Sequence, residues 1–150
     1  MNILFNKDAD EFITITLYYH IHKEGEKEKL FIYRQKADAP KVIADKLKVM
    51  TGKFKMPDFF THNEIVKNSM VYRADGLSYQ SFVNYKENIL KNLLKEVDIE
   101  NQKQKVDSEN CGRLHPAIAE ALYNCFNDEY LNPSVSLDDL AKEPEPTIDE

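Results

Sequence analysis

Two histidines spaced two residues apart are the first candidates for metal chemistry in this chain of 150 residues. His20 and His22 lie in a segment of alternating apolar and polar residues. On a β-strand both side chains would point to the same side, with their Cα atoms roughly 7 Å apart. A zinc site needs three or four ligands, and no other histidine or cysteine stands at a spacing that predicts convergence on this pair. We therefore expect no structural metal, and a metal-dependent hydrolase using His20 and His22 is the third of three functional hypotheses.

Signatures of nucleophilic catalysis and of phosphate binding are not found in the sequence. It contains no Gly-x-Ser-x-Gly, and its 4 glycines form no Gly-x-Gly-x-x-Gly. Cys111 and Cys125 form no Cys-x-x-Cys pair, and the sequence places no histidine to activate either thiol. These observations favour a protein that is not an enzyme, has no cofactor, and keeps both thiols free in a reducing cytoplasm.

Aromatic side chains gather on one face of a predicted hairpin. If the turn is centred between Gly25 and Glu26, one pair of tyrosines and one histidine–phenylalanine pair lie opposite each other. The candidate binding residues are Tyr18, His20, Phe31, Tyr33 and Arg34. Such a face can stack unpaired bases. The same pattern arises when helices cover both faces of a sheet, and the number of amphipathic helices favours this second interpretation, in which the rings belong to the core.

The segment that carries these residues also gives the clearest structural signal. Residues 11–21 alternate between two faces and are rich in β-branched and aromatic side chains, which is typical of a strand. A charged run with one glycine follows, and residues 30–33 return as a second strand. A lone hairpin is marginal in water, so we expect it to pack on helices or to be extended by a second hairpin. Asp75-Gly76 favours that second hairpin within residues 70–82.

Apolar residues at helical spacing predict four helices elsewhere in the chain. Pro40 and Gly52 are typical of the start and end of a short amphipathic helix. Thr61 and Glu64 fit the spacing of a capping box at the start of a second helix. The predicted helices cover residues 40–51, 63–69, 82–97 and 116–130.

The composition is that of a folded domain with a charged end. A chain of this length can bury one sufficient core. No stretch approaches the ~20 apolar residues that span a bilayer, and no apolar run near the start is typical of a signal peptide, so we expect no membrane partner and a cytoplasmic location. Residues 134–150 carry six acids and one lysine, and hence −5 of the total charge of −6. We predict one domain over residues 1–133 and a flexible acidic tail over residues 134–150.

Lysine outnumbers arginine 17 to 3 in the sequence. This bias is typical of AT-rich genes, such as those of phages and other mobile elements. Bidentate recognition of guanine favours arginine, so a reader of duplex DNA sequence is not expected.

These observations predict an α+β fold in which an N-terminal antiparallel hairpin packs with three to four helices. The leading functional hypothesis is a small non-enzymatic interaction protein, such as an accessory factor, inhibitor or assembly chaperone, that binds a protein partner. It rests on the missing catalytic signatures and on aromatic residues beside an acidic tail. The alternative is a single-stranded nucleic-acid-binding protein that uses the aromatic hairpin face and regulates access with its tail.

Overall fold

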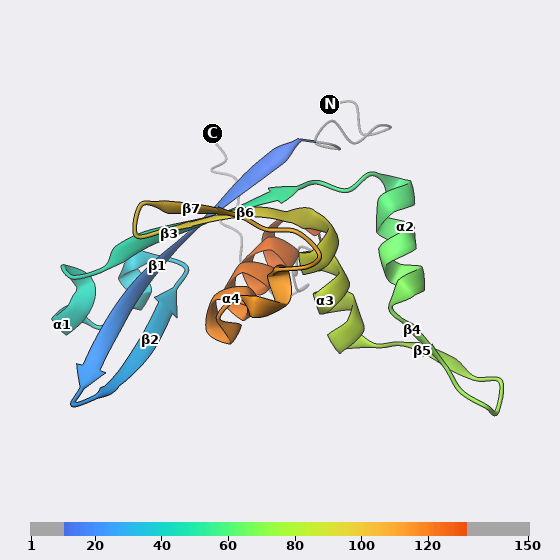
Figure 1. Cartoon of the computed structure of the whole chain (residues 1–150), viewed down its shortest axis with the longest axis horizontal. Coiled ribbons are helices and arrows are strands. Elements are labelled where there is room, and N and C mark those ends of the chain that lie inside the picture. The colour runs from blue at the N-terminus through green and yellow to red at the C-terminus, as the bar shows by residue number, and fades with distance from the viewer. Residues whose placement is uncertain (1–10, 132–150) are drawn as a thin grey trace, which may run out of the picture.

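A computed structural model describes residues 11–131 and shows an α+β fold (Figure 1). The main sheet is antiparallel with the strand order β2-β1-β3-β6-β7, and β4 and β5 form a separate two-stranded sheet. The strands are β1 Phe12–Glu24, β2 Lys27–Tyr33, β3 Lys48–Lys55, β4 Met70–Tyr72, β5 Ser78–Gln80, β6 Leu94–Ile99 and β7 Gln102–Lys105. The helices are α1 Lys41–Ala44, α2 Phe59–Asn68, α3 Phe82–Leu93 and α4 Pro116–Phe126, with shorter helical segments η1 Lys36–Asp38, η2 Cys111–Arg113 and η3 Asn127–Leu131. The predicted acidic tail lies outside the described residues.

The predicted N-terminal hairpin is confirmed, and so is its register. Tyr18 pairs with Tyr33, and His20 pairs with Phe31. Gly25 in the turn has a φ of 64°, a left-handed conformation that glycine adopts without steric cost. Both strands are longer than predicted, because β1 continues to Glu24 and β2 begins at Lys27, so most of the charged run that was expected to form the turn belongs to the strands.

The helix predicted over residues 40–51 is wrong beyond its first turn. α1 has 4 residues, and from Lys48 onward the chain forms β3, which pairs with β1. Burial alternates along β3, because its even-numbered residues face the helices. Gly52 is not a helix cap: a Cβ atom at this position would lie 2.6 Å from a δ-carbon of Leu122. The glycine thus lets α4 approach the strand closely.

The helix predicted over residues 82–97 is shorter than expected. α3 ends at Leu93, and the chain continues directly into β6, where Val97 is buried. Glu100 and Asn101 connect β6 to β7 with φ values of 55° and 61°, as in a tight hairpin turn with two left-handed residues. β6 also pairs with β3, which is distant in the sequence, so local spacing gave no information about this partner.

The other two predicted helices are present. α2 starts earlier than predicted, because Asp58 rather than Thr61 caps it: the Asp58 carboxylate accepts a hydrogen bond of 2.7 Å from the Thr61 amide. α4 starts where expected, and His115 caps it by accepting a hydrogen bond of 3.1 Å from the Ala117 amide. Both caps satisfy amides that a helix leaves without internal partners.

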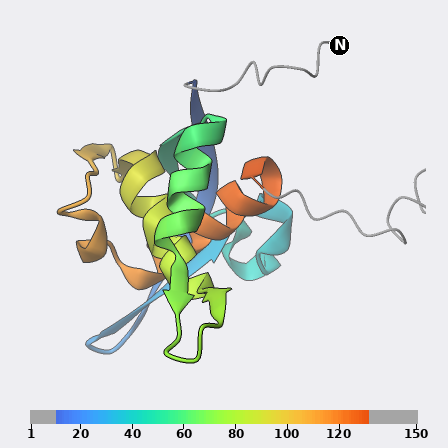
Figure 2. The ribbon, with the colours of Figure 1, turned by 90° about the vertical axis from the view of Figure 1, so that its right-hand side faces the viewer.

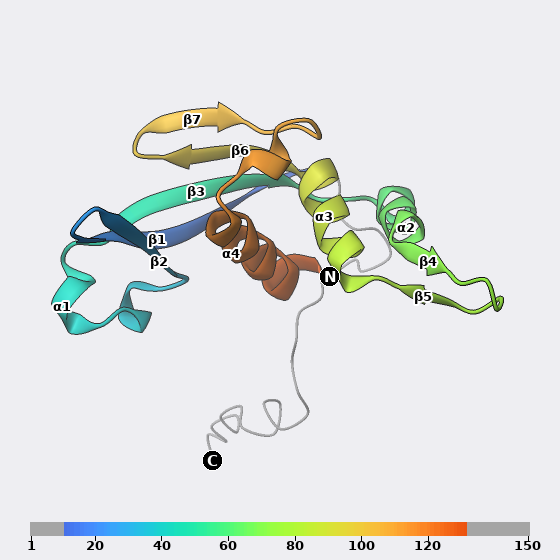
Figure 3. The ribbon, with the colours of Figure 1, turned by 60° about the horizontal axis from the view of Figure 1, so that its bottom comes forward.

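Helices α3 and α4 pack against one face of the main sheet (Figure 3). Odd-numbered residues of β1 such as Leu17 and Tyr19 are fully buried on this face. The rings of Phe54 and Phe126 stack there with centroids 4.1 Å apart. Even-numbered residues of β1 are exposed or half-buried on the opposite face. Among the described residues, the short segments η1 and α1 border this second face and cover it only in part, so helices do not cover both faces equally as expected.

The second predicted hairpin is present, but it does not extend the main sheet. β4 and β5 project from the rest of the molecule beyond α2 and α3 (Figures 1 and 2). Ser69 is fully buried at the base of this hairpin. Its hydroxyl donates to the Ile65 carbonyl at 2.6 Å and accepts from the Asn88 amide at 3.2 Å, and its carbonyl accepts from the Ser81 amide at 2.8 Å. We call residues 59–83 the arm and the rest of the described chain the body.

The described helices are short. The longest, α3, has 12 residues, and none within residues 11–131 combines the length and the apolarity that crossing a bilayer requires. Cys111 and Cys125 are buried and not joined in a disulfide.

Candidate functional site

The predicted binding face on β1 and β2 lies outside the hydrophobic core. Tyr18, His20 and Tyr33 are half-buried, and Phe31 exposes 41% of its surface. All of these except Tyr18 line a shallow cleft of about 330 Å³ that the start of α1 borders. The ammonium of Lys36 lies 5.6 Å from the centre of the Tyr18 ring, within the range of a cation–π attraction. The structure thus brings four of the five predicted residues together and partly covers them.

Arg34, the fifth predicted residue, points away from this face. Its Nη2 lies 2.6 Å from Oδ2 of Asp128, so the ion pair joins the end of β2 to η3. The hydrogen bond from Arg34 to Asp128 raises the pKa of the guanidinium further. Arg34 therefore connects the sheet to the helical layer and does not complete the aromatic face.

The two histidines on β1 lie near each other without a further ligand. The ring centroids of His20 and His22 are 6.2 Å apart. Nε2 of His22 lies 3.6 Å from a carboxylate oxygen of Glu24, which also pairs with Lys29 at 3.6 Å. Within residues 11–131, no three histidine, cysteine, aspartate or glutamate side chains are grouped so that they could hold a metal ion. The hydrolase hypothesis gains no support from this geometry.

Exposed apolar side chains are concentrated on the arm. Of the 12 large hydrophobic residues that are exposed in the described chain, seven belong to it. We call these seven the arm surface: Phe59, Phe60, Tyr72, Leu77, Tyr79, Phe82 and Val83. Phe60 exposes 80% of its surface. These residues lie in two places, with Phe59 and Phe60 at the start of α2 and the others on or beside the β4–β5 hairpin. Exposed apolar side chains that concentrate in one segment are typical of interaction sites.

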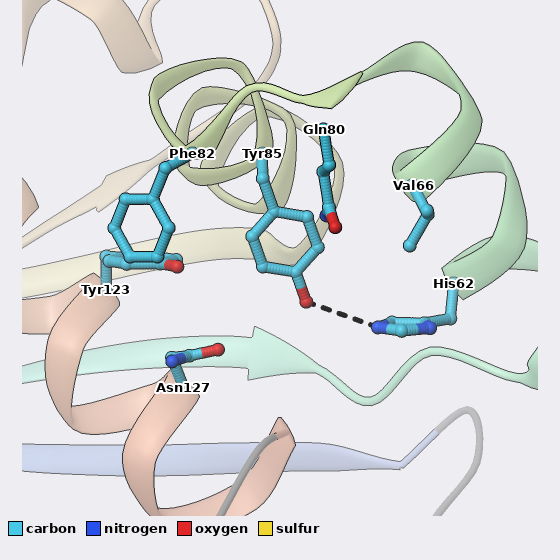
Figure 4. A pocket seen from close by; sticks show the side chains of 7 residues that line it. All are labelled: His62, Val66, Gln80, Phe82, Tyr85, Tyr123 and Asn127. Atoms are coloured by element: carbon cyan, nitrogen blue, oxygen red, sulfur yellow. Dashed lines mark hydrogen bonds between the residues drawn. The ribbon is translucent and has the colours of Figure 1, made fainter. Parts of the chain in front are cut away.

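A cleft of about 260 Å³ lies where the arm meets α4, and we call it the arm cleft (Figure 4). It is lined by His62, Val66, Gln80, Phe82, Tyr85, Tyr123 and Asn127. Three of these residues carry phenyl or phenol rings, two carry primary amides, and none is a lysine, arginine, aspartate or glutamate. Nε2 of His62 lies 3.2 Å from the hydroxyl oxygen of Tyr85, which places these two groups in hydrogen-bond contact.

The hydroxyl of Tyr123 has no hydrogen-bond partner among the described residues. The side chain is 1% exposed, and its ring meets the ring of Phe82 edge to face, with centroids 6.5 Å apart. Figure 4 shows the hydroxyl directed toward the side of the cleft where Tyr85 and Asn127 lie. Burying a hydroxyl without a partner costs about 1–3 kcal/mol, so this atom requires an explanation.

The surroundings of the Tyr123 hydroxyl disfavour negative charge. Burial is the largest cause of its raised pKa, and Tyr85, Asp128 and Glu120 add to the shift by disfavouring the phenolate, so that the pKa reaches about 12. Glu120 accepts a hydrogen bond of 2.8 Å from Lys86, so its charge is partly balanced. The remaining field at the Tyr123 hydroxyl still opposes an anion and favours a hydrogen-bond donor.

The arm cleft could not be predicted from the sequence, because its walls come from distant parts of the chain. Tyr85 and Tyr123 each occupy the apolar side of a helix, where a tyrosine most often indicates packing. The arm surface did carry a signal. Phe59 and Phe60 are adjacent and precede the segment predicted as a helix, so no buried helical face was assigned to either ring.

No protein family model, curated protein or solved structure matches this chain. The function is therefore inferred from the hairpin face, the arm surface and the arm cleft.

Proposed function

We propose that this chain is a non-enzymatic interaction protein, acting as an accessory factor or inhibitor, that binds a protein partner through the arm surface. The observation that carries the proposal is the concentration of seven exposed large apolar residues on the arm. Removing apolar surface from water gains roughly 25 cal/mol per Å². A partner that covers these side chains would gain this free energy on binding.

The shape of the hairpin indicates the kind of surface that would cover it. Tyr72 pairs with Ser78, and Tyr79 is the next residue along the strand. Because side chains alternate between the faces of a strand, Tyr72 and Tyr79 lie on opposite faces of the two-stranded ribbon. A partner that contacts both tyrosines must enclose the hairpin, so we infer a partner with an apolar groove.

The charge of the arm favours a protein partner over a nucleic acid. The arm carries two acids, Glu64 and Asp75, and two bases, Lys67 and Arg73. Arg73 lies 3.1 Å from Asp75, so this base is already paired. Affinity for nucleic acid comes largely from contacts between basic side chains and phosphates, and a neutral arm offers few of them.

Site-specific photo-crosslinking in cells of the native host tests this proposal. A photoreactive phenylalanine analogue at Phe60 or Tyr72 is expected to give one discrete protein adduct, which mass spectrometry then identifies. The same analogue at Phe12, on the main sheet, is the matched control because Phe12 is also exposed, at 56%. We expect no discrete adduct from the control position.

Reconstitution with the purified partner completes the test. Phe60→Ala and Tyr72→Ala are expected to weaken binding at least tenfold each, because buried aromatic residues dominate interface energetics. Phe12→Ala should leave the affinity unchanged. The proposal is wrong if the two arm substitutions leave the affinity of the purified pair unchanged, or if Phe12→Ala weakens it equally.

Single-stranded nucleic-acid binding is a second candidate, because the aromatic face of β1 and β2 lies outside the core. Phe31 is exposed and Tyr33 is half-buried beside it. If this face stacks bases, Phe31→Ala and Tyr33→Ala should each weaken oligonucleotide binding by about 1–3 kcal/mol. We expect no such binding at physiological salt, with or without residues 134–150, because Arg34 is engaged by Asp128. Micromolar binding that is lost on Tyr33→Ala in a folded protein would place this candidate first.

A further inference from the structure

The lining of the arm cleft has the composition of a site for a positively charged group. The rings of Phe82, Tyr85 and Tyr123 border it, and cations are attracted to the faces of such rings. The amides of Gln80 and Asn127 add carbonyl oxygens that accept hydrogen bonds. No lysine or arginine lines the cleft, and the lining base His62 is in hydrogen-bond contact with Tyr85. The ammonium of Lys86 lies 5.9 Å from the centre of the Tyr123 ring, where it is held by Glu120.

The unpartnered hydroxyl of Tyr123 is an independent observation that points to the same ligand chemistry. Its oxygen is buried and accepts no hydrogen bond within residues 11–131. Asp128 and Glu120 both act on this group electrostatically as negative charges. A guest that donates a hydrogen bond would satisfy the hydroxyl, and a positive charge on it would be attracted to the ring faces. The two carboxylates add little to this attraction, because Asp128 is paired with Arg34 at 2.6 Å and Glu120 with Lys86 at 2.8 Å.

We propose that the arm cleft binds one arginine or lysine side chain of the protein partner. This inference rests on the proposed function for the source of the side chain. The aliphatic stem would pack beside Val66 and Phe82, and the charged head would reach the hydroxyl of Tyr123. Because the Tyr123 hydroxyl is buried, a side chain would have to move to admit the guest; Phe82, which is 68% exposed and meets the Tyr123 ring edge to face, would be that side chain.

The test uses n-propylguanidinium chloride and, as a neutral probe of the same shape, n-propylurea. Each is titrated into the full isotope-labelled protein while the side-chain amide signals of Gln80 and Asn127 are followed by NMR. We expect saturable shifts with the guanidinium salt at millimolar concentration, and at least fivefold weaker binding of the urea. Sodium chloride at the same ionic strength controls for salt.

Two variants connect the binding to the hydroxyl of Tyr123. Tyr123→Phe is expected to weaken guanidinium binding at least threefold while the Tm stays the same or rises, because the substitution removes a buried hydroxyl without a partner. Tyr19→Phe is the control, because Tyr19 is a buried tyrosine on β1 that does not line the arm cleft. This substitution should leave guanidinium binding unchanged. If the Tyr123 hydroxyl takes no part in binding, Tyr123→Phe would leave guanidinium binding unchanged, whatever its effect on the Tm.

Three results would overturn the inference. Equal binding of both probes would show that charge is not selected. Unchanged binding by Tyr123→Phe would mean that the guest does not contact this hydroxyl. If the purified partner fails to displace the guanidinium probe, the site does not receive a side chain of that partner. Failure of the proposed function gives a different result, since the probe would still bind while Phe60→Ala and Tyr72→Ala leave the partner affinity unchanged.

Discussion

The two predicted β-hairpins of this chain have opposite surroundings. β1 and β2 join three further strands and bury one face under α4, whereas β4 and β5 pair only with each other within the described residues. Leu17 and Tyr19 in the first hairpin are fully buried, while Tyr72 and Tyr79 in the second expose 73% and 53% of their surfaces. Apolar residues of the body therefore stabilise the fold, and those of the arm require another role, which we propose is binding.

Replacing one phenylalanine in each region gives the largest expected contrast. Phe54→Ala should lower the free energy of unfolding by about 3–5 kcal/mol, because Phe54 is fully buried and stacked on Phe126. Phe60→Ala should change it by less than about 0.5 kcal/mol, because Phe60 is 80% exposed. Urea denaturation measures both. A loss of more than about 2 kcal/mol on Phe60→Ala would break the distinction between body and arm.

The second largest effect is expected from alkaline pH, which should lower the free energy of unfolding of the body. Burial raises the pKa of Cys125 from 9.0 to about 11 and that of Tyr123 from 10.0 to about 12. Below pH 9 both groups are protonated in the folded and the unfolded chain, so their contribution is fully present. Between pH 9 and about 11 the unfolded thiol ionises while the folded one keeps its proton, so stability falls, on the order of 2 kcal/mol.

Tyr123 contributes the same way between pH 10 and about 12. The measurement is urea denaturation at a series of pH values from 8 to about 11, where Cys125 dominates. Cys125→Ala should give a flatter profile over this range than the unchanged protein does. Parallel profiles for the two proteins would contradict the burial of this thiol.

Two glycines provide the smallest contrast between the regions. A Cβ at Gly52 would meet Leu122 at 2.6 Å inside the core, so Gly52→Ala should cost about 1–3 kcal/mol. Nothing lies within 4 Å of a Cβ at Gly76, but its φ of 87° is unfavourable for alanine, so Gly76→Ala should cost about 1 kcal/mol. Hydrogen exchange should place the second effect in the arm alone. Faster exchange in β3 of the Gly76→Ala variant would contradict this separation.

Local signals predicted those parts of the fold whose partners are close in the sequence. Alternating residues in β1 and the single turn glycine fixed the first hairpin, and Asp75-Gly76 indicated the second. β3 was mistaken for a helix because Gly52 resembles a helix cap, although its role is to admit Leu122 from α4. β6 was assigned to the preceding helix because its pairing with β3 is a contact between distant segments.

The candidate sites, too, could be predicted only where their residues are close in the sequence. The register of the first hairpin predicted which aromatic rings lie together on β1 and β2. It did not predict the position of Arg34, whose partner Asp128 lies near the other end of the described chain. The arm cleft needs His62, Tyr85 and Tyr123 from three helices, and their meeting depends on tertiary packing that no local pattern contains.

The hydrogen bond that closes the base of the arm hairpin has a consequence for how this protein can evolve. Because the Ser81 amide meets the Ser69 carbonyl at 2.8 Å, the chain leaves α2 and enters α3 at nearly one point. The strand–turn–strand segment between them can change in length or sequence without moving the main sheet. Relatives of this chain should therefore diverge fastest at this hairpin, exchanging one recognition segment for another while the body that carries it is inherited unchanged.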